Sequence, residues 1–241
     1  MKNYFILFIL YTTSIGILSN NEANIIVCTY YTPSHKELAT EWLLPSIKDT
    51  VDIVVGTGPQ VCPTAQFYTQ GWTQTTLHKV LFIIHTIANH MGRIIVFADP
   101  DIIFLQPIEP IIRQLLIDKE FVVQQDTPKK MLCSGFFALI ANEKTLKLWQ
   151  GVADFIYKHP NICDQGALNY CLNRRINRYN ISWAFLPTTH FCGGGTFKKR
   201  EWKPGKKVII PKTACMFHAN FADYQHKIAY LAAVQHFFVG A

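Results

Sequence analysis

The chain has 241 residues, a length that suits one domain, and 49% of its residues are hydrophobic while only 16% are charged. This composition excludes a disordered protein, because it supplies enough apolar surface to build a core. The formal net charge of +7 favours an anionic partner without identifying it. Nucleic acid is not expected, because the most basic stretch, residues 198–207, contains Pro204 and Gly205 and is typical of a loop, with no nucleic-acid-binding motif beside it.

A secretory signal peptide is predicted at the N-terminus. Lys2 precedes an apolar run over residues 4–11, which is followed by a weaker stretch and then by polar residues. A short membrane anchor is the alternative, but Thr12 to Gly16 interrupt the run, and a span needs about 20 consecutive apolar residues. Residues 1–21 are therefore assigned to a signal peptide (or short anchor) and residues 22–241 to the folded domain. This assignment predicts a protein of the secretory pathway, lumenal or exported, that contacts a membrane only through an uncleaved N-terminal segment.

The first half of the domain alternates strands and helices. Apolar runs rich in β-branched residues predict strands at 24–29, 51–55 and 94–98. One helix is predicted between the first two strands, at 34–47, and another before the third, where apolar residues from Leu77 to Met91 recur at intervals of three and four. Alternation of this kind favours a parallel sheet that is covered by helices.

The second half continues with more strands and helices. Strands are expected at 121–124, 136–141, 181–186, 208–210 and 214–217, and helices after a cap at Asn142, from Asp164, and at 223–238. No linker and no internal repeat interrupts this order. The chain is therefore expected to form a single α/β domain with a mixed, mainly parallel sheet flanked by helices.

Seven cysteines are spread along the chain without a C-x-x-C pair, so a zinc site is not expected. Because their number is odd, at least one thiol has no disulfide partner within the chain. Buried free cysteines are the expectation, and one or two disulfides are the alternative in an oxidising compartment.

Asp99 and Asp101 form the only D-x-D sequence in the chain, directly after the strand predicted at 94–98. Open α/β sheets bind ligands outside the carboxyl ends of their strands, so a site is expected here. Residues two apart in an extended segment point to the same side, and two converging carboxylates repel each other unless a cation lies between them. Hard divalent ions take carboxylate oxygens, so the pair predicts a metal site. A solvated turn shaped by Pro100 is the alternative.

Three further features are candidates for the same site, and each has a structural alternative. His218 suits a third metal ligand, although a histidine among apolar residues is often a core residue. Asp164 and Gln165 open a predicted helix, where Asp164 would equally serve as an N-cap. Lys79 would simply extend from the exposed side of its helix if it had no anionic partner.

Taken in order, these segments resemble the nucleotide-diphospho-sugar transferase family of glycosyltransferases, over almost all of residues 24–240. The resemblance is carried by the helix with Lys79 and by the segments RIIVFADPDIIFLQPI, SGFFALIANEKTLKLW, DQGALN, LPTTHFCGGGTF and HANFADYQHK. It departs from the family at Cys133, which replaces the asparagine of an Asn-Ser-Gly type of segment. The resemblance implies the GT-A (Rossmann-like) fold.

The resemblance also implies a divalent cation, Mn²⁺ or Mg²⁺, that bridges the two phosphates of a nucleoside-diphosphate sugar. Asp99, Asp101 and His218 would hold this cation, with Asp101 and His218 as the direct ligands and Asp99 serving partly the ribose. Lysines and a metal together stabilise the negative charge that develops on a leaving diphosphate.

The same resemblance assigns residues to the donor and the acceptor. Lys79 would approach the donor from its helix, and Lys227 would contact the diphosphate. Independently of the resemblance, the three glycines at 193–195 permit close approach of the backbone to a ligand, which makes Gly194 a candidate contact for the donor, with a flexible turn as the alternative. Asp164 would contact the donor sugar or the acceptor, and Gln165 would lie near the anomeric carbon, as in similar retaining enzymes.

These expectations predict a metal-dependent glycosyltransferase that moves a sugar from a nucleoside-diphosphate donor to a hydroxyl of a glycan, glycoprotein or other acceptor, with retention of configuration. A secreted, catalytically inactive protein of the same fold that binds sugar nucleotides or carbohydrates is the first alternative. A metal-dependent phosphohydrolase is the second, but the chain offers too few neighbouring carboxylate and histidine ligands to hold two ions.

Overall fold

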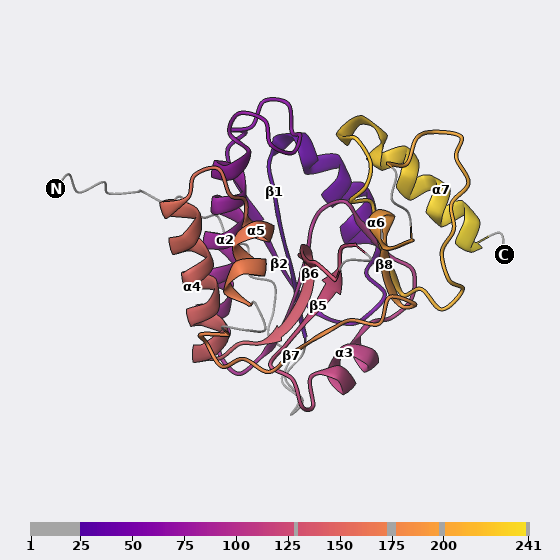
Figure 1. Ribbon diagram of the computed structural model, residues 1–241. Coiled ribbons are helices and arrows are strands. Elements are labelled where there is room, and N and C mark those ends of the chain that lie inside the picture. Colours follow the sequence, from indigo (N-terminus) through magenta and orange to yellow (C-terminus); the bar gives the residue numbers. More distant parts are fainter. Residues whose placement is uncertain (1–24, 128–129, 173–176, 198–200, 240–241) are drawn as a thin grey trace.

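A six-stranded sheet forms the centre of the protein, as Figure 1 shows for the computed structural model. Its strands lie in the order β2-β1-β3-β6-β5-β7, with bounds β1 Ile26–Tyr31, β2 Asp52–Thr57, β3 Ile94–Ala98, β5 Phe121–Gln125, β6 Leu132–Ile140 and β7 Trp183–Phe185. All six run in one direction except β6, which is antiparallel to both of its neighbours. The predicted mixed, mainly parallel sheet is thus confirmed. The structure describes residues 25–127, 130–172, 177–197 and 201–239.

One face of the sheet is covered by three helices, at the left of Figure 1. These are α2 (Trp72–Asn89), α4 (Glu143–Lys158) and α5 (Asp164–Cys171). The central strands are apolar on both faces because both faces are covered. Phe137 of β6 stacks on Phe97 of β3 with ring centroids 5.3 Å apart, and Trp149 of α4 lies 4.8 Å from the same Phe137 ring.

The predicted cap of α4 at Asn142 is confirmed. The Asn142 side chain accepts the backbone N–H of Thr145 at 2.9 Å, and the Thr145 hydroxyl accepts the backbone N–H of Asn142 at 3.0 Å. This reciprocal pair satisfies backbone donors that the first turn of a helix leaves without partners. It fixes the start of α4 so that Leu148, Trp149 and Ile156 are buried against the sheet.

The opposite face carries a smaller sheet and several short helices. Strands β4 (Ile102–Phe104), β9 (Met216–His218) and β8 (Phe191–Gly193) form this sheet in the order β4-β9-β8. The other elements are η1 (Pro33–His35), η2 (Leu38–Leu43), α1 (Leu44–Ser46), α3 (Glu109–Leu115), α6 (Gly194–Phe197), η3 (Tyr224–His226) and α7 (Lys227–Val239). Apolar side chains of α7 and the small sheet, among them Phe217, Tyr230 and Leu231, form a core of their own at the right of Figure 1.

Two further predicted elements have different outcomes. The helix predicted at 34–47 is confirmed as a helical run over residues 33–46, whose hydrogen bonding changes from 3₁₀ (η1) to π (η2) and ends in the α-helical turn α1. The strand predicted at 208–210 is wrong. Val208 and Ile210 are buried and Ile209 is exposed, but this segment pairs with no strand of the described chain. Alternation predicts burial correctly there, whereas a strand also needs a neighbour.

All seven cysteines are free thiols and six of them are buried, which confirms the expectation for them. The predicted signal peptide, residues 1–21, lies outside the described residues, as do Lys198 to Arg200 of the basic stretch. Of the helices that the structure describes, none combines the length and the apolar character that crossing a bilayer requires.

Candidate active site

A pocket of about 530 Å³ opens at the edge of the main sheet where β1, β3 and β5 end. This is the edge at which open α/β sheets bind their ligands. Its wall contains Tyr31 at the end of β1, Asp99 just after β3 and Asp126 just after β5. Phe67 from the loop before α2 and Lys227 from the start of α7 lie on the other sides.

The two aspartates of the D-x-D sequence lie on the connection between β3 and β4. The backbone N–H of Asp99 donates to the carbonyl of Gly135 at 2.7 Å, and the carbonyl of Asp101 accepts the N–H of Ala219 at 2.9 Å. The backbone turns at Pro100 and Asp101, so the expectation of an extended segment is wrong, yet both carboxylates reach the same pocket. Asp101 is only 3% exposed, which excludes the alternative of a solvated turn.

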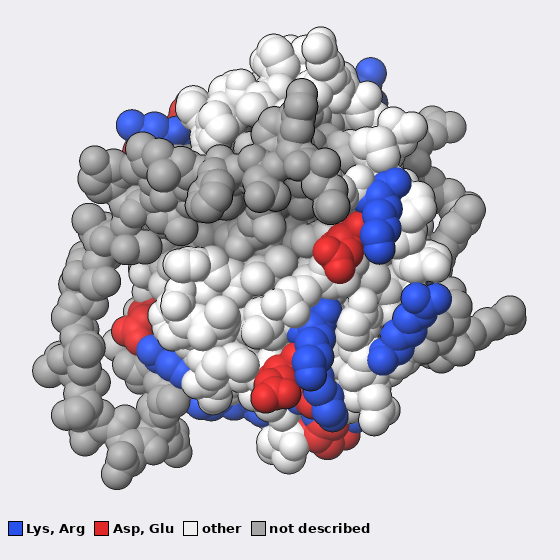
Figure 2. Space-filling view, turned by 90° about the vertical axis from the view of Figure 1, so that its left-hand side faces the viewer, with Lys and Arg blue, Asp and Glu red and all other residues white. Residues whose placement is uncertain are grey.

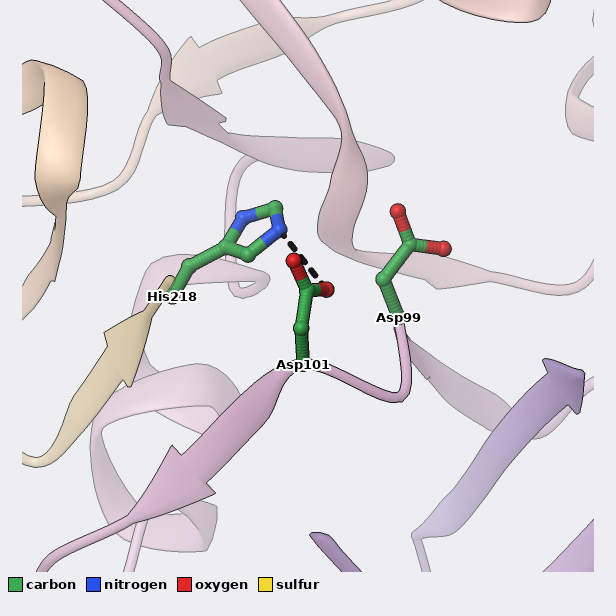
Figure 3. A group of neighbouring side chains, drawn as sticks. All are labelled: Asp99, Asp101 and His218. Carbon is green, nitrogen blue, oxygen red and sulfur yellow. Dashed lines mark ion pairs between the residues drawn. The ribbon is translucent and has the colours of Figure 1, made fainter. Parts of the chain in front are cut away.

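His218 lies beside Asp101 because β9 pairs with β4. In this antiparallel pair His218 is opposite Ile102, the residue that follows Asp101. Figure 3 shows the imidazole at the end of β9 directed toward the carboxylate, with Nε2 3.2 Å from Oδ1 of Asp101. On the other side of the ring, Nδ1 lies 2.9 Å from the Gln124 amide oxygen and 3.6 Å from the Cys133 sulfur. The ring orientation is therefore set by partners on both nitrogens.

Two buried lysines neutralise the acidic groups of the pocket. Lys79 Nζ lies 3.1 Å from Asp99 Oδ1 and 2.5 Å from Asp164 Oδ2, and Lys227 forms an ion pair with Asp101. The lysines are 8% and 5% exposed, so the alternative of a solvent-exposed Lys79 is wrong. Three carboxylates share two ammonium groups here.

The pKa values of these groups reflect burial and their partners. Burial alone would lower the pKa of Lys79, but the adjacent Asp164 and Asp99 carboxylates raise it above its usual value. Burial would raise the pKa of Asp101, but Lys227 and His218 hold it well below its usual range. Burial likewise would lower the pKa of His218, and the carboxylate of Asp101 raises it to about 10. Burial raises the pKa of Asp99, and the negative charge of Asp101 adds to this effect.

The residues present fit a divalent cation. Asp99, Asp101 and His218 each offer a ligand atom, and these atoms lie within 4.8 Å of one another. Two carboxylates and an imidazole form a donor set that suits Mg²⁺ or Mn²⁺. Gly135 leaves room for this arrangement, because a Cβ there would lie 2.4 Å from Cε1 of His218 and 2.6 Å from Oδ2 of Asp99.

Asp164 and Gln165 both line the pocket from the first turn of α5. Cys163 rather than Asp164 is the N-cap, so the capping alternative for Asp164 is wrong. Gln165 accepts the backbone N–H of Ser134 at 3.3 Å and donates its amide to Asp126 at 3.2 Å. The structure therefore brings both residues to the site, and their roles remain predictions.

Asp126 is a site residue that the sequence did not single out. It is 8% exposed, and its carboxylate accepts the Asn220 amide at 2.6 Å in addition to that of Gln165. Burial raises its pKa. A signal was present, because Asp126 directly follows a strand, just as Asp99 does.

Gly194 is buried away from the pocket lining. A Cβ on Gly194 would lie 3.0 Å from Cβ of Phe221 and 3.2 Å from the Tyr230 ring, so the residue packs against these aromatic side chains. The neighbouring Gly195 donates its N–H to Asn220 at 3.3 Å, and Asn220 lines the pocket. The glycine segment thus supports the wall of the pocket, and direct contact of Gly194 with a donor remains a prediction.

Comparisons with known proteins agree with the fold. The sequence profile of the nucleotide-diphospho-sugar transferase family matches residues 24–231. No curated protein matches the sequence. Many solved structures are similar in fold, among them the following three.

The first is a glycosyltransferase involved in the glycosylation of the major capsid of PBCV-1, with 12% identity, a TM-score of 0.58, and 87% of this chain and 98% of that chain covered. The bifunctional glycosyltransferase WbbM has 10% identity and a TM-score of 0.55, with 93% and 53% covered. The galactosyltransferase LgtC, in complex with donor and acceptor sugar analogues, has 9% identity and a TM-score of 0.54, with 87% and 95% covered. At such identities the similarity is evidence for the fold. Because the family profile spans most of the chain, the protein belongs to the nucleotide-diphospho-sugar transferase family and is a glycosyltransferase of the GT-A fold.

Proposed function

We propose that the protein transfers a sugar from a nucleoside-diphosphate donor to an acceptor hydroxyl, with Mn²⁺ or Mg²⁺ bound by Asp99, Asp101 and His218. The observation that carries the proposal is the convergence of these three side chains in a pocket that also holds two buried lysines. The bound cation and the two lysine ammonium groups would together stabilise the negative charge of a diphosphate.

The residues around the cluster then have separate tasks. A bound divalent cation supplies a Lewis acid that stabilises the charge on the departing diphosphate. Asp101 and His218 are the direct ligands, and Asp99 lies beside them and serves partly the ribose. Lys227 and Lys79 donate hydrogen bonds to the donor, which charge makes stronger than neutral ones.

The sugar lies toward α5 in this proposal. Asp164 contacts the donor sugar or the acceptor, and Gln165 lies near the anomeric carbon. The hydrogen bonds of Gln165 to Ser134 and Asp126 hold its amide in place, which supports a positioning role. Retention of configuration follows by similarity to retaining members of the family and is part of the proposal.

Hydrolysis and transfer with a panel of sugar nucleotides test the proposal. We expect at least one nucleoside-diphosphate sugar to be turned over in the presence of Mn²⁺ or Mg²⁺ and not in EDTA, because the cluster provides the ligands for one cation. Equal turnover in EDTA would contradict the metal dependence. Tight binding of donors without any turnover would instead identify the inactive sugar-nucleotide-binding protein. The anomeric signal of the product in NMR spectra reports retention or inversion.

Lys227→Ala should weaken UDP binding by about tenfold and reduce its salt dependence, because one buried phosphate contact is removed. Titrations of UDP with Mn²⁺ at low and high ionic strength measure both effects. Lys147→Ala, which changes an exposed lysine on α4, serves as the control. Unchanged affinity in Lys227→Ala would remove this residue from the donor site.

A further inference from the structure

A second groove adjoins the active-site pocket on the other side of Tyr68. It lies between the start of α2 and the end of α4 and has a volume of about 780 Å³. Tyr68 lines both cavities, so one continuous surface runs from the metal-binding end of the pocket, past this side chain, into the groove. A substrate larger than one sugar would follow this surface.

The groove differs from the pocket in its chemistry. The described residues that line it include none with a charge: Tyr68, Thr69, Gln70, Gly71, Thr73, Gln74, Leu77, Ile156, Tyr157, Pro160 and Asn161. Amide and hydroxyl side chains supply both hydrogen-bond donors and acceptors there. The pocket, in contrast, holds carboxylates and lysines. The donor diphosphate matches the pocket, and an uncharged molecule rich in hydroxyl groups matches the groove.

Two aromatic side chains that line the groove are largely exposed to solvent. Tyr68 is 81% exposed and Tyr157 is 82% exposed. An aromatic ring offers a flat apolar face with a polar tip, which suits the mixed C–H and hydroxyl surface of a pyranose ring. Figure 2 shows the side of the molecule that carries α4, where charged side chains occur in small groups and most of the described surface is uncharged.

The loop that presents Tyr68 is held by its own hydrogen bonds. Thr69 Oγ1 lies 2.5 Å from Thr64 Oγ1 and 3.3 Å from the Cys62 sulfur. Gly71 packs so closely that a Cβ would lie 1.8 Å from the carbonyl oxygen of Val61. Tyr68 itself has φ of +59°, a left-handed conformation that is rare for a bulky residue. Strained backbone conformations of this kind persist where the surrounding structure holds them in place, and they cluster at binding sites.

We infer that the groove binds the acceptor, and that the acceptor is an uncharged oligosaccharide of two or more sugar residues. Its glycosylated residue lies in the pocket, the chain passes over Tyr68, and the next residues pack on Tyr157 and bond to Gln74 and Asn161. This inference rests on the proposed transferase function. Beyond that function, it specifies the chemical class of the acceptor and the surface that recognises the acceptor.

An array of uncharged oligosaccharides, from monosaccharides to hexasaccharides, together with sulfated and sialylated counterparts, tests the inference. We expect the full chain to retain uncharged oligosaccharides, and Tyr157→Ala to bind them about tenfold more weakly, which corresponds to the loss of one aromatic contact. Gln74→Ala should weaken the same ligands. Ile117→Ala removes a side chain of matched exposure, 83%, outside the groove and should change nothing. Thermal melts show that each variant is folded.

The inference is overturned if no uncharged oligosaccharide is retained, if Tyr157→Ala binds as tightly as the unmodified protein, or if charged glycans are preferred. Donor hydrolysis by the unmodified protein, measured in parallel, keeps this inference separate from the proposed function. If the unmodified protein hydrolyses a donor and Tyr157→Ala binds the array as tightly as the unmodified protein does, the proposed transferase function stands and the groove is excluded as the acceptor site. Array binding that depends on Tyr157, without turnover of any sugar nucleotide, would overturn the acceptor role and leave a carbohydrate-binding surface.

Discussion

Asp101→Asn should abolish Mn²⁺-dependent UDP binding and lower donor hydrolysis by on the order of a thousandfold. His218 and Lys227 both pair with Asp101, so the substitution removes the carboxylate charge around which the proposed cation site is arranged. Metal-assisted stabilisation of a leaving group contributes several kcal/mol, and about 4 kcal/mol corresponds to a thousandfold in rate. Isothermal titration with UDP and Mn²⁺, together with a hydrolysis assay, measures both effects.

The control for this prediction is Asp118→Asn. Asp118 pairs with Lys119 at the surface, where its side chain is 73% exposed, so its replacement should leave UDP binding unchanged. Circular dichroism of Asp101→Asn must show the native fold for the comparison to hold. A folded Asp101→Asn protein that binds UDP and Mn²⁺ as the unmodified protein does would exclude Asp101 as a ligand.

Lys79→Met should lower the free energy of unfolding by about 3–5 kcal/mol. Removal of one partner from a buried ion pair leaves an uncompensated charge, which is costly in a medium of low polarisability. Lys79 is the ammonium group between Asp99 and Asp164, so its loss leaves these two carboxylates facing the same space. Urea denaturation followed by tryptophan fluorescence, without added metal, gives the change directly.

A double variant distinguishes charge imbalance from lost packing. Lys79→Met combined with Asp164→Asn removes one cation and one anion, so it should recover a large part of the stability that Lys79→Met loses. Lys147→Met, at an exposed lysine of α4, should change stability by less than about 0.5 kcal/mol. If Lys79→Met is as stable as the unmodified protein, Lys79 does not neutralise the aspartates in solution.

The ion pair between Lys79 and Asp99 shows which features sequence patterns predict and which they do not. The helical spacing predicted α2, and the position after an apolar strand predicted a site at Asp99. Neither pattern predicts how α2 packs on the sheet. This packing places Lys79 Nζ 3.1 Å from Oδ1 of Asp99, a residue 20 positions away in the sequence. The sequence alone left a solvent-exposed Lys79 as an alternative, and only packing excludes it.

Asp164 is a second residue whose partner could not be predicted from the sequence pattern. An aspartate before an apolar helical pattern is typical of an N-cap, because its side chain can accept backbone N–H groups. The helix begins one residue earlier than that interpretation requires, with Cys163 at the cap. A shift of one position therefore directs the Asp164 carboxylate to Lys79 instead of to its own backbone. Helix boundaries are the part of a local prediction that sequence patterns determine least sharply.

The sequence by itself determined the order of the six strands of the main sheet and of helices α2, α4, α5 and α7, the cap at Asn142 and the position of the D-x-D sequence, because periodicity, capping and strand ends are properties of neighbouring residues. The family followed from the resemblance of an ordered set of motifs. The tertiary structure decided which side chains meet. Asp126 and Asn220 are 94 residues apart and are joined by a hydrogen bond of 2.6 Å. Tyr68 and Tyr157 line one groove because α2 packs on α4. Contacts of this kind depend on how elements pack on the sheet, and packing between distant segments leaves no periodic trace in a single sequence.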